Sequence, residues 1–270
     1  MTVFSGTAVS YAAFRPGIPR EVAEILHAAA PSPSPRRLLD IGTGPGFVVT
    51  ALLPYFDDII AIESEPDMLT AAGVLVRRAL PAQSMLQLEY SRAEDFTPPE
   101  GWRADLVTVC RAFHWLDQSA VLDRLDAQVT PHGAVAIFSD LSLWTADAPW
   151  QQAIRALIQE FLGEQRRAGT TVFTPSGIPY QQVLQASAFS KVREIQVPVR
   201  RAWLVPAVLG YLASTSFAAP HLFGDRLPQF EQAATTILNG HATDGLLMED
   251  NAFTVLIAHR PLPAPQQERR

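Results

Sequence analysis

The chain has 270 residues and a formal net charge of −6 at pH 7, so it shows no sign of the basic face of a nucleic-acid-binding protein. Apolar residues make up 48% of it, enough to bury a sizeable core in one large domain. A single cysteine excludes an internal disulfide. There is neither a signal-peptide pattern nor a uniformly apolar stretch of membrane-spanning length, so we expect a cytoplasmic protein without a membrane segment.

Short apolar runs alternate with helical patterns from Arg36 onward. The expected strands are 38–41, 59–63, 85–90, 104–110 and 133–138, and the expected helices between them are 47–55, 66–80 and 119–129. Such alternation predicts an α/β fold with a doubly wound, Rossmann-like parallel sheet.

The segments on either side of this alternation are expected to be mainly helical. Helices are predicted at 20–30, 150–167, 178–186, 206–215 and 226–238, with further strands at 192–199 and 252–260. We therefore expect one domain, 1–260, with an N-terminal helical lid (1–30), a core (36–139), a helical insertion (140–188), a C-terminal part that completes the sheet (189–260) and a disordered tail (261–270).

A glycine-rich turn, Asp40-Ile41-Gly42-Thr43-Gly44-Pro45-Gly46, follows the first expected strand. Glycines at alternate positions allow a sharp turn and the close approach of a ligand. A P-loop is excluded, because Phe47 rather than lysine follows the last glycine. A dinucleotide fingerprint would need its third glycine one residue later, which counts against a nicotinamide-dependent oxidoreductase but leaves it as an alternative.

The turn resembles the first motif of class I S-adenosylmethionine (SAM)-dependent methyltransferases. This resemblance implies a SAM-binding domain whose sheet is mostly parallel with an antiparallel last strand. It also implies that the residues bordering the methionine and ribose parts of SAM are Asp40, Gly42, Thr43, Gly44 and Gly46.

Glu63 ends the second expected strand, about 20 residues past the glycines, where an acid can accept hydrogen bonds from ribose hydroxyls. The resemblance implies this role for Glu63 and places Ser64 and Met68 near ribose and adenine. A solvated acid at a strand end is the alternative.

Ser91–Phe96 resembles the family segment that lies against adenine, although serine replaces the family's glycine at its first position. The resemblance implies adenine contacts for Ala93 and Glu94. The alternative is that Glu94 is an acid in the first turn of a helix.

The sequence Cys-Arg-Ala-Phe-His-Trp at 110–115 follows the fourth expected strand, at the sheet edge where open α/β sheets bind ligands. Ala-Phe-His-Trp resembles a branch of small-molecule methyltransferases that includes trans-aconitate and ubiquinone-type enzymes, which implies that Cys110 and Phe113 border SAM. His114 is a candidate catalytic base, because an unperturbed histidine titrates near neutral pH; alternatively, it only shapes the pocket. Arg111, the second catalytic candidate, replaces the usual Gln, Asn or Ser and indicates either an anionic acceptor or a salt bridge to the insertion.

The N-terminal pattern Y-x-x-x-R-P-x-x-P also resembles this branch, and it implies that Tyr11 and Arg15 close over the SAM carboxylate. A structural role in docking the first helix is the alternative. No histidine, cysteine or carboxylate cluster has the spacing of a metal site, so we expect no metal.

These features favour SAM-dependent methyl transfer to a small molecule, with a hydrophobic natural-product intermediate as the preferred acceptor. Neither a nucleic-acid partner nor a membrane span is expected. Eight aromatic residues could line the acceptor pocket or equally form a core; they are Trp144, Trp150, Phe161, Phe173, Tyr180, Trp203, Tyr211 and Phe217. A SAM-binding protein that does not transfer methyl groups, such as a scaffold or a cyclase, is the other alternative.

Overall fold

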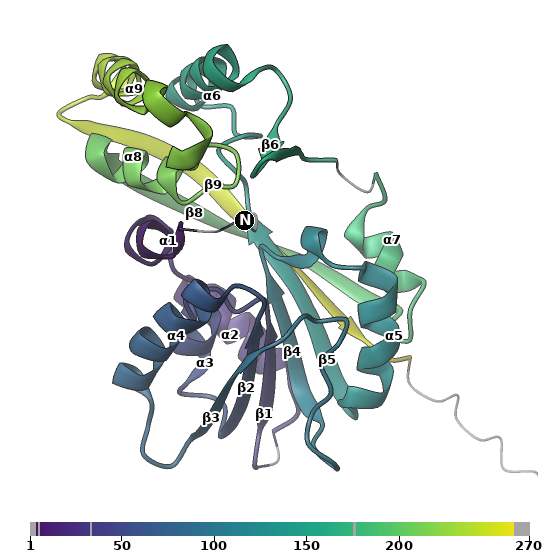
Figure 1. Ribbon diagram of the computed structural model, residues 1–270. Coiled ribbons are helices and arrows are strands. Elements are labelled where there is room, and N and C mark those ends of the chain that lie inside the picture. Colours follow the sequence, from purple (N-terminus) through teal and green to yellow (C-terminus); the bar gives the residue numbers. More distant parts are fainter. Residues whose placement is uncertain (1–3, 5, 33, 175–176, 262–270) are drawn as a thin grey trace, which may run out of the picture.

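In the computed structural model, a seven-stranded sheet is covered by helices on both faces (Figure 1). The structure describes residues 4, 6–32, 34–174 and 177–261. The strand order is β3-β2-β1-β4-β5-β9-β8. Strands β1 to β5 pair in parallel, and β9 lies antiparallel between β5 and β8. The expected Rossmann-like sheet with an antiparallel last strand is therefore confirmed.

The strands of this sheet are β1 (Arg37–Ile41), β2 (Asp58–Glu63), β3 (Met85–Tyr90), β4 (Ala104–Cys110), β5 (Val129–Asp140), β8 (Lys191–Leu204) and β9 (Leu246–His259). The α-helices are α1 (Ala8–Phe14), α2 (Arg20–Ala29), α3 (Phe47–Leu52), α4 (Pro66–Ala79), α5 (Gln118–Gln128), α6 (Pro149–Leu162), α7 (Tyr180–Gln185), α8 (Val205–Ala213) and α9 (Leu227–His241). Short 3₁₀ turns are Phe113–Trp115, Pro220–Leu222 and Gly224–Arg226.

Alternate residues of the central strands pack on opposite faces of the sheet. Leu38 lies in a core cluster with residues of α2, α3 and α4. Leu39 and Ile41 lie in a second cluster with residues of α5 and α7. Burial on both faces explains why the strands read as continuous apolar runs in the sequence.

Three predicted element lengths differ from the structure in the second half of the chain. The helix expected at 150–167 ends at Leu162, because Gly163 takes a φ of 92° that a continuing helix does not allow. A two-stranded hairpin, β6 (Arg167–Ala168) with β7 (Thr171–Val172), follows it and was not predicted. Strands β8 and β9 are each 14 residues long, well beyond their predicted ranges.

A third hydrophobic cluster joins α6, α8 and α9. We call these helices together with the β6–β7 hairpin the cap (residues 149–172 and 205–241). Figure 1 shows the cap around the far ends of β8 and β9, beyond the carboxyl ends of the parallel strands. Helix α1 packs against α8 of the cap and α4 of the core, so the N-terminal helix lies where the two parts meet.

The predicted disordered tail, apart from Pro261, lies outside the described residues. Within the described ranges, none of the helices combines the length and apolarity needed to cross a bilayer.

Candidate functional site

The glycine turn between β1 and α3 holds all three of its glycines in the left-handed region, with φ of 66° at Gly42, 55° at Gly44 and 89° at Gly46. A Cβ at Gly42 would come within 2.7 Å of the Ala112 Cβ, and one at Gly46 would collide with the Val76 side chain. A Cβ at Gly44 would meet no protein atom within 4 Å. Gly42 and Gly46 therefore serve packing, whereas Gly44 faces open space that a ligand can approach.

The Glu63 carboxylate lies against this turn. Its Oε2 accepts a hydrogen bond from the Gly44 N–H at 2.8 Å, and its Oε1 accepts from the N–H groups of Ser64 at 2.8 Å and Glu65 at 3.0 Å. Burial raises the pKa of Glu63, and these three hydrogen bonds oppose the shift. The predicted acid is thus tied to the predicted turn at the ends of adjacent strands.

Asp40 is buried beneath the turn. Its Oδ1 accepts a hydrogen bond of 2.6 Å from the Thr108 hydroxyl, and burial raises the pKa of Asp40 to about 7. Asp40 Oδ2 and Thr43 Oγ1 are buried as well, and the Thr43 side chain lowers the pKa of Asp40 and so partly offsets the effect of burial. These buried polar groups, the open side of Gly44 and the nearby Glu63 fit the polar groups of SAM.

The raised pKa of Asp40 predicts a measurable dependence of stability on pH. The folded state binds the Asp40 proton more tightly than the unfolded chain, so its stabilising effect is complete below about pH 4 and is lost as the pH rises through about 7. An Asp40→Asn variant keeps an acceptor for Thr108 and cannot ionise. We expect it to melt several degrees above the wild type at pH 8, with a smaller difference at pH 5. The same difference in melting temperature between variant and wild type at both pH values would contradict this assignment.

The remaining predicted cofactor residues are spread along the same edge. Ser64 is exposed, while Met68 on α4 and Ala93 are buried. Glu94 lies in a turn rather than a helix, and its Oε1 accepts a hydrogen bond from the Asp117 N–H at 2.9 Å, at the start of α5. Burial raises the pKa of the Cys110 thiol to about 12, which makes it a neutral side chain rather than a nucleophile.

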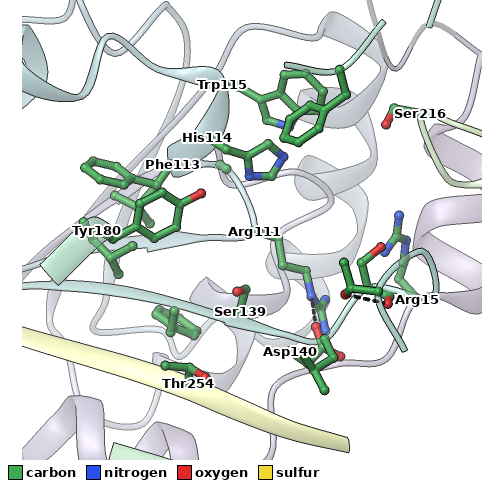
Figure 2. A pocket seen from close by; sticks show the side chains of 18 of the residues that line it. Arg15, Arg111, Phe113, His114, Trp115, Ser139, Asp140, Tyr180, Ser216 and Thr254 are labelled. Atoms are coloured by element: carbon green, nitrogen blue, oxygen red, sulfur yellow. Dashed lines mark hydrogen bonds and ion pairs between the residues drawn. The ribbon is translucent and has the colours of Figure 1, made fainter. Parts of the chain in front are cut away.

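A cavity of about 410 Å³ opens between the ends of β4 and β5 and the cap. Five predicted site residues line it together: Tyr11, Arg15, Arg111, Phe113 and His114. Figure 2 shows the last four of them. The glycine turn and Glu63 do not line it; they lie at the ends of the neighbouring strands β1 and β2. The predicted site thus forms two adjoining parts, one at the glycine turn and one in the cavity.

Arg111 forms an ion pair at the boundary with the predicted insertion. Its Nε lies 2.6 Å from Asp140 Oδ1 (Figure 2), and its Nη1 donates to the Pro16 carbonyl at 3.0 Å. The residue has a φ of 55°, rare outside glycine. Asp140 also pairs with Arg201 at 2.9 Å, and Arg201 pairs with Glu249 at 3.3 Å. The structure thus shows the predicted salt bridge, and contact of Arg111 with an acceptor stays a prediction.

Arg15 is held by neutral groups of the cap. Its Nε donates to Ser214 Oγ at 2.8 Å and its Nη1 to the Tyr211 hydroxyl at 3.2 Å. Its guanidinium lies 4.9 Å from the Tyr11 ring centroid and 4.5 Å from that of Tyr211. Arg15 therefore both docks the N-terminal segment and presents a positive charge to the cavity.

His114 lies among aromatic rings rather than beside a carboxylate. Its ring centroid is 4.6 Å from that of Trp115 and 5.5 Å from that of Phe173. Burial, and secondarily the charge of Arg166, lower the pKa of His114 to about 4. The imidazole is therefore neutral near pH 7 and a weaker base than an unperturbed histidine.

Arg166 also lines the cavity, and sequence reasoning did not find it. The sequence assigned it to a helix, which the structure ends four residues earlier. The local sequence does not distinguish Arg166 from its neighbour Arg167. Only the path of the chain after Gly163 brings Arg166, and not Arg167, to the cavity.

Comparison with known proteins identifies the core. Residues 39–135 match the family of methyltransferase domains. An uncharacterized methyltransferase of Mycobacterium tuberculosis is 31% identical over 138 residues, which are 51% of this chain and 52% of the relative. Residues 39–135 are therefore similar in sequence to methyltransferase domains. The chain as a whole spans about half the length of the first curated relatives it matches.

Longer matches extend beyond residues 39–135. A trans-aconitate 2-methyltransferase of Methylobacterium nodulans is 26% identical over 203 residues, 74% of this chain and 67% of the relative. Among solved structures, a phosphoethanolamine N-methyltransferase of Haemonchus contortus covers 94% of this chain and 57% of its own, with a TM-score of 0.53 and 14% identity. At that identity the likeness shows the fold.

Proposed function

We propose that this chain catalyses SAM-dependent methyl transfer to a small molecule with an apolar body, such as a natural-product intermediate. The observation that carries the proposal is the glycine turn, open at Gly44 and tied to the buried Glu63, directly beside a cavity of about 410 Å³ under the cap. SAM, when bound, supplies an activated methyl group. The chain's part is to hold the acceptor in line and to exclude water.

The residues proposed to hold SAM follow the two parts of the site. Glu63 accepts from the ribose, and the buried Asp40 and Thr43 supply the polar groups beneath the turn. Tyr11 and Arg15 lie on the cavity side, where Arg15 can bind the methionine carboxylate. The other proposed contacts are Gly42, Gly44, Gly46, Ser64, Met68, Ala93, Glu94, Cys110 and Phe113.

Aromatic residues of the cap and of α7, together with Phe173 directly after the β6–β7 hairpin, support an apolar acceptor. Of the eight residues left open by the sequence, those that line the cavity are Phe173, Tyr180, Tyr211 and Phe217. Those that contribute only to the cap core are Trp144, Trp150, Phe161 and Trp203. The relative named for trans-aconitate also supports a small acceptor.

The lowered pKa of His114 supports a role in the wall of the pocket over a role as general base. We expect its imidazole NMR signals, assigned by their absence in His114→Gln, to stay constant from pH 6 to 8 and to shift only near pH 4. Because the folded pKa lies below the unfolded one, wild-type stability relative to His114→Gln should fall as the pH drops from about 6.5 to 4. A titration midpoint near 6.5 would instead favour the base.

The proposed function is tested by incubating the purified chain with methyl-labelled SAM and a panel of apolar small molecules that carry hydroxyl, amine or carboxyl groups. Transfer of label to a panel member that stops in a Gly44→Val variant supports the proposal. Binding of the product S-adenosylhomocysteine without any label transfer would favour the non-transferring alternative.

A further inference from the structure

The charges around the cavity leave two guanidinium groups without a carboxylate partner. Asp140 is shared by Arg111 and Arg201, and Arg201 also reaches Glu249, so these two acids balance these two arginines. Arg15 and Arg166 also line the cavity. Within the part of the chain that the structure describes, neither forms an ion pair.

Of these two arginines, Arg166 has fewer hydrogen bonds from its side chain. Arg15 donates to Ser214 and Tyr211, whereas the Arg166 side chain has no hydrogen bond to any described residue, and its Nε is buried. Its guanidinium carbon lies 4.3 Å from the Phe173 ring centroid and 5.4 Å from that of Phe217. Aromatic faces stabilise the cation but leave the N–H groups at its edge unused.

The β6–β7 hairpin fixes this arrangement. Arg166 and Phe173 lie at its two ends, and the Phe173 N–H donates to the Arg166 carbonyl at 2.8 Å. The Gly169 N–H at the hairpin tip donates to the Ser216 carbonyl, also at 2.8 Å. Backbone hydrogen bonds thus hold Arg166 and Phe173 next to each other and fix the hairpin to the segment after α8.

Leaving this guanidinium unpaired is unfavourable. Burial lowers the pKa of Arg166, and the charge of Arg15 lowers it further. A bound anion relieves both effects, because a charge-assisted hydrogen bond compensates lost hydration. SAM would add little relief, since its carboxylate is offset by its own ammonium and sulfonium charges.

We propose that Arg166, presented by the β6–β7 hairpin, is the specificity determinant for an acceptor that joins an aromatic or otherwise apolar body to one carboxylate. Arg166 binds the carboxylate, and Phe173 and Phe217 contact the body beside it. The guanidinium can bind a carboxylate through two parallel hydrogen bonds, and its one positive charge balances the one negative charge of a carboxylate but only part of that of a phosphate dianion. This inference rests on the proposed function for the identity of the pocket and does not assign the methylated atom.

The test compares matched acids and amides by ligand-observed NMR and calorimetry, using the whole chain saturated with S-adenosylhomocysteine. The probes are benzoate, phenylacetate and cinnamate, each with its primary amide, and phenyl phosphate. We expect at least one acid to bind at least tenfold more tightly than its amide. Arg166→Gln should abolish that preference, and Arg167→Gln should retain it, because Arg167 is the adjacent arginine and does not line the cavity.

Four results would overturn the inference. They are equal binding of acids and amides, no binding of any acid, tighter binding of phenyl phosphate than of every acid, and an acid preference that survives in Arg166→Gln. S-adenosylhomocysteine binding is measured first in each variant. Its absence from the wild type would overturn the proposed function itself, so the two failures are distinguishable.

Discussion

Replacing Gly44 by valine is expected to lower the affinity for S-adenosylhomocysteine at least 100-fold, a loss of about 3 kcal/mol. A side chain at this position would enter the open space beside the Glu63 carboxylate, which accepts a hydrogen bond from the Gly44 N–H. A β-branched residue also resists the φ of 55° found there. Calorimetric titration of the folded variant measures the effect.

Valine substitutions at two other glycines serve as controls that distinguish loss of ligand binding from backbone strain. Gly101 has a φ of 73° and equally open surroundings, but it lies in the loop that leads to the start of β4, at the opposite edge of the sheet. We expect Gly101→Val to cost similar stability, about 1–3 kcal/mol, and to bind normally. Gly46→Val should impair folding, because its Cβ would meet Val76. Normal binding by Gly44→Val would refute the placement of the cofactor.

Truncating Asp140 to alanine is expected to be the most destabilising change near the cavity. Its carboxylate is about 10% exposed and bonds Arg111 at 2.6 Å and Arg201 at 2.9 Å. The arginines draw the pKa of Asp140 below its usual range despite burial. Removing one member of a buried charge network leaves the others uncompensated, at about 3–5 kcal/mol. Urea denaturation monitored by tryptophan fluorescence provides the free energy of unfolding.

The control for this prediction is an exposed aspartate in a similar pair. Asp250 lies 3.4 Å from Arg200, and its side chain is 81% exposed. Asp250→Ala should cost less than about 1 kcal/mol. Equal losses in the two variants would mean that the Arg111–Asp140–Arg201 chain contributes no more than a surface pair.

The sheet could be predicted from the sequence because β1, β2, β4 and most of β5 are buried on both faces and therefore read as apolar runs between helices. Strand β8 was harder to predict, because Arg200 and Arg201 resemble a loop and are held in the strand only by pairing with Glu249 and Asp250 of β9. The β6–β7 hairpin has two residues in each strand, too few to show any periodicity.

In the site, too, features set by local sequence could be predicted, and features set by contacts between distant residues could not. Local spacing predicted the glycine turn, Glu63 and the Phe113–Trp115 segment, because each lies at the end of a strand or just after it. Spacing could not show that Arg111 pairs with Asp140, or that Arg166 leaves its expected helix and reaches the cavity. Nor could it predict the pKa of His114, which depends on burial and on Arg166, a residue 52 positions away in the chain.

The cofactor assignment is tested by isothermal titration of the purified chain with S-adenosylhomocysteine, with NADH as the matched control. We predict micromolar, saturable binding of S-adenosylhomocysteine at one site per chain and no heat from NADH. Binding of NADH, or no binding of S-adenosylhomocysteine to a folded chain, would contradict the assignment of the glycine turn and of every site contact built on it.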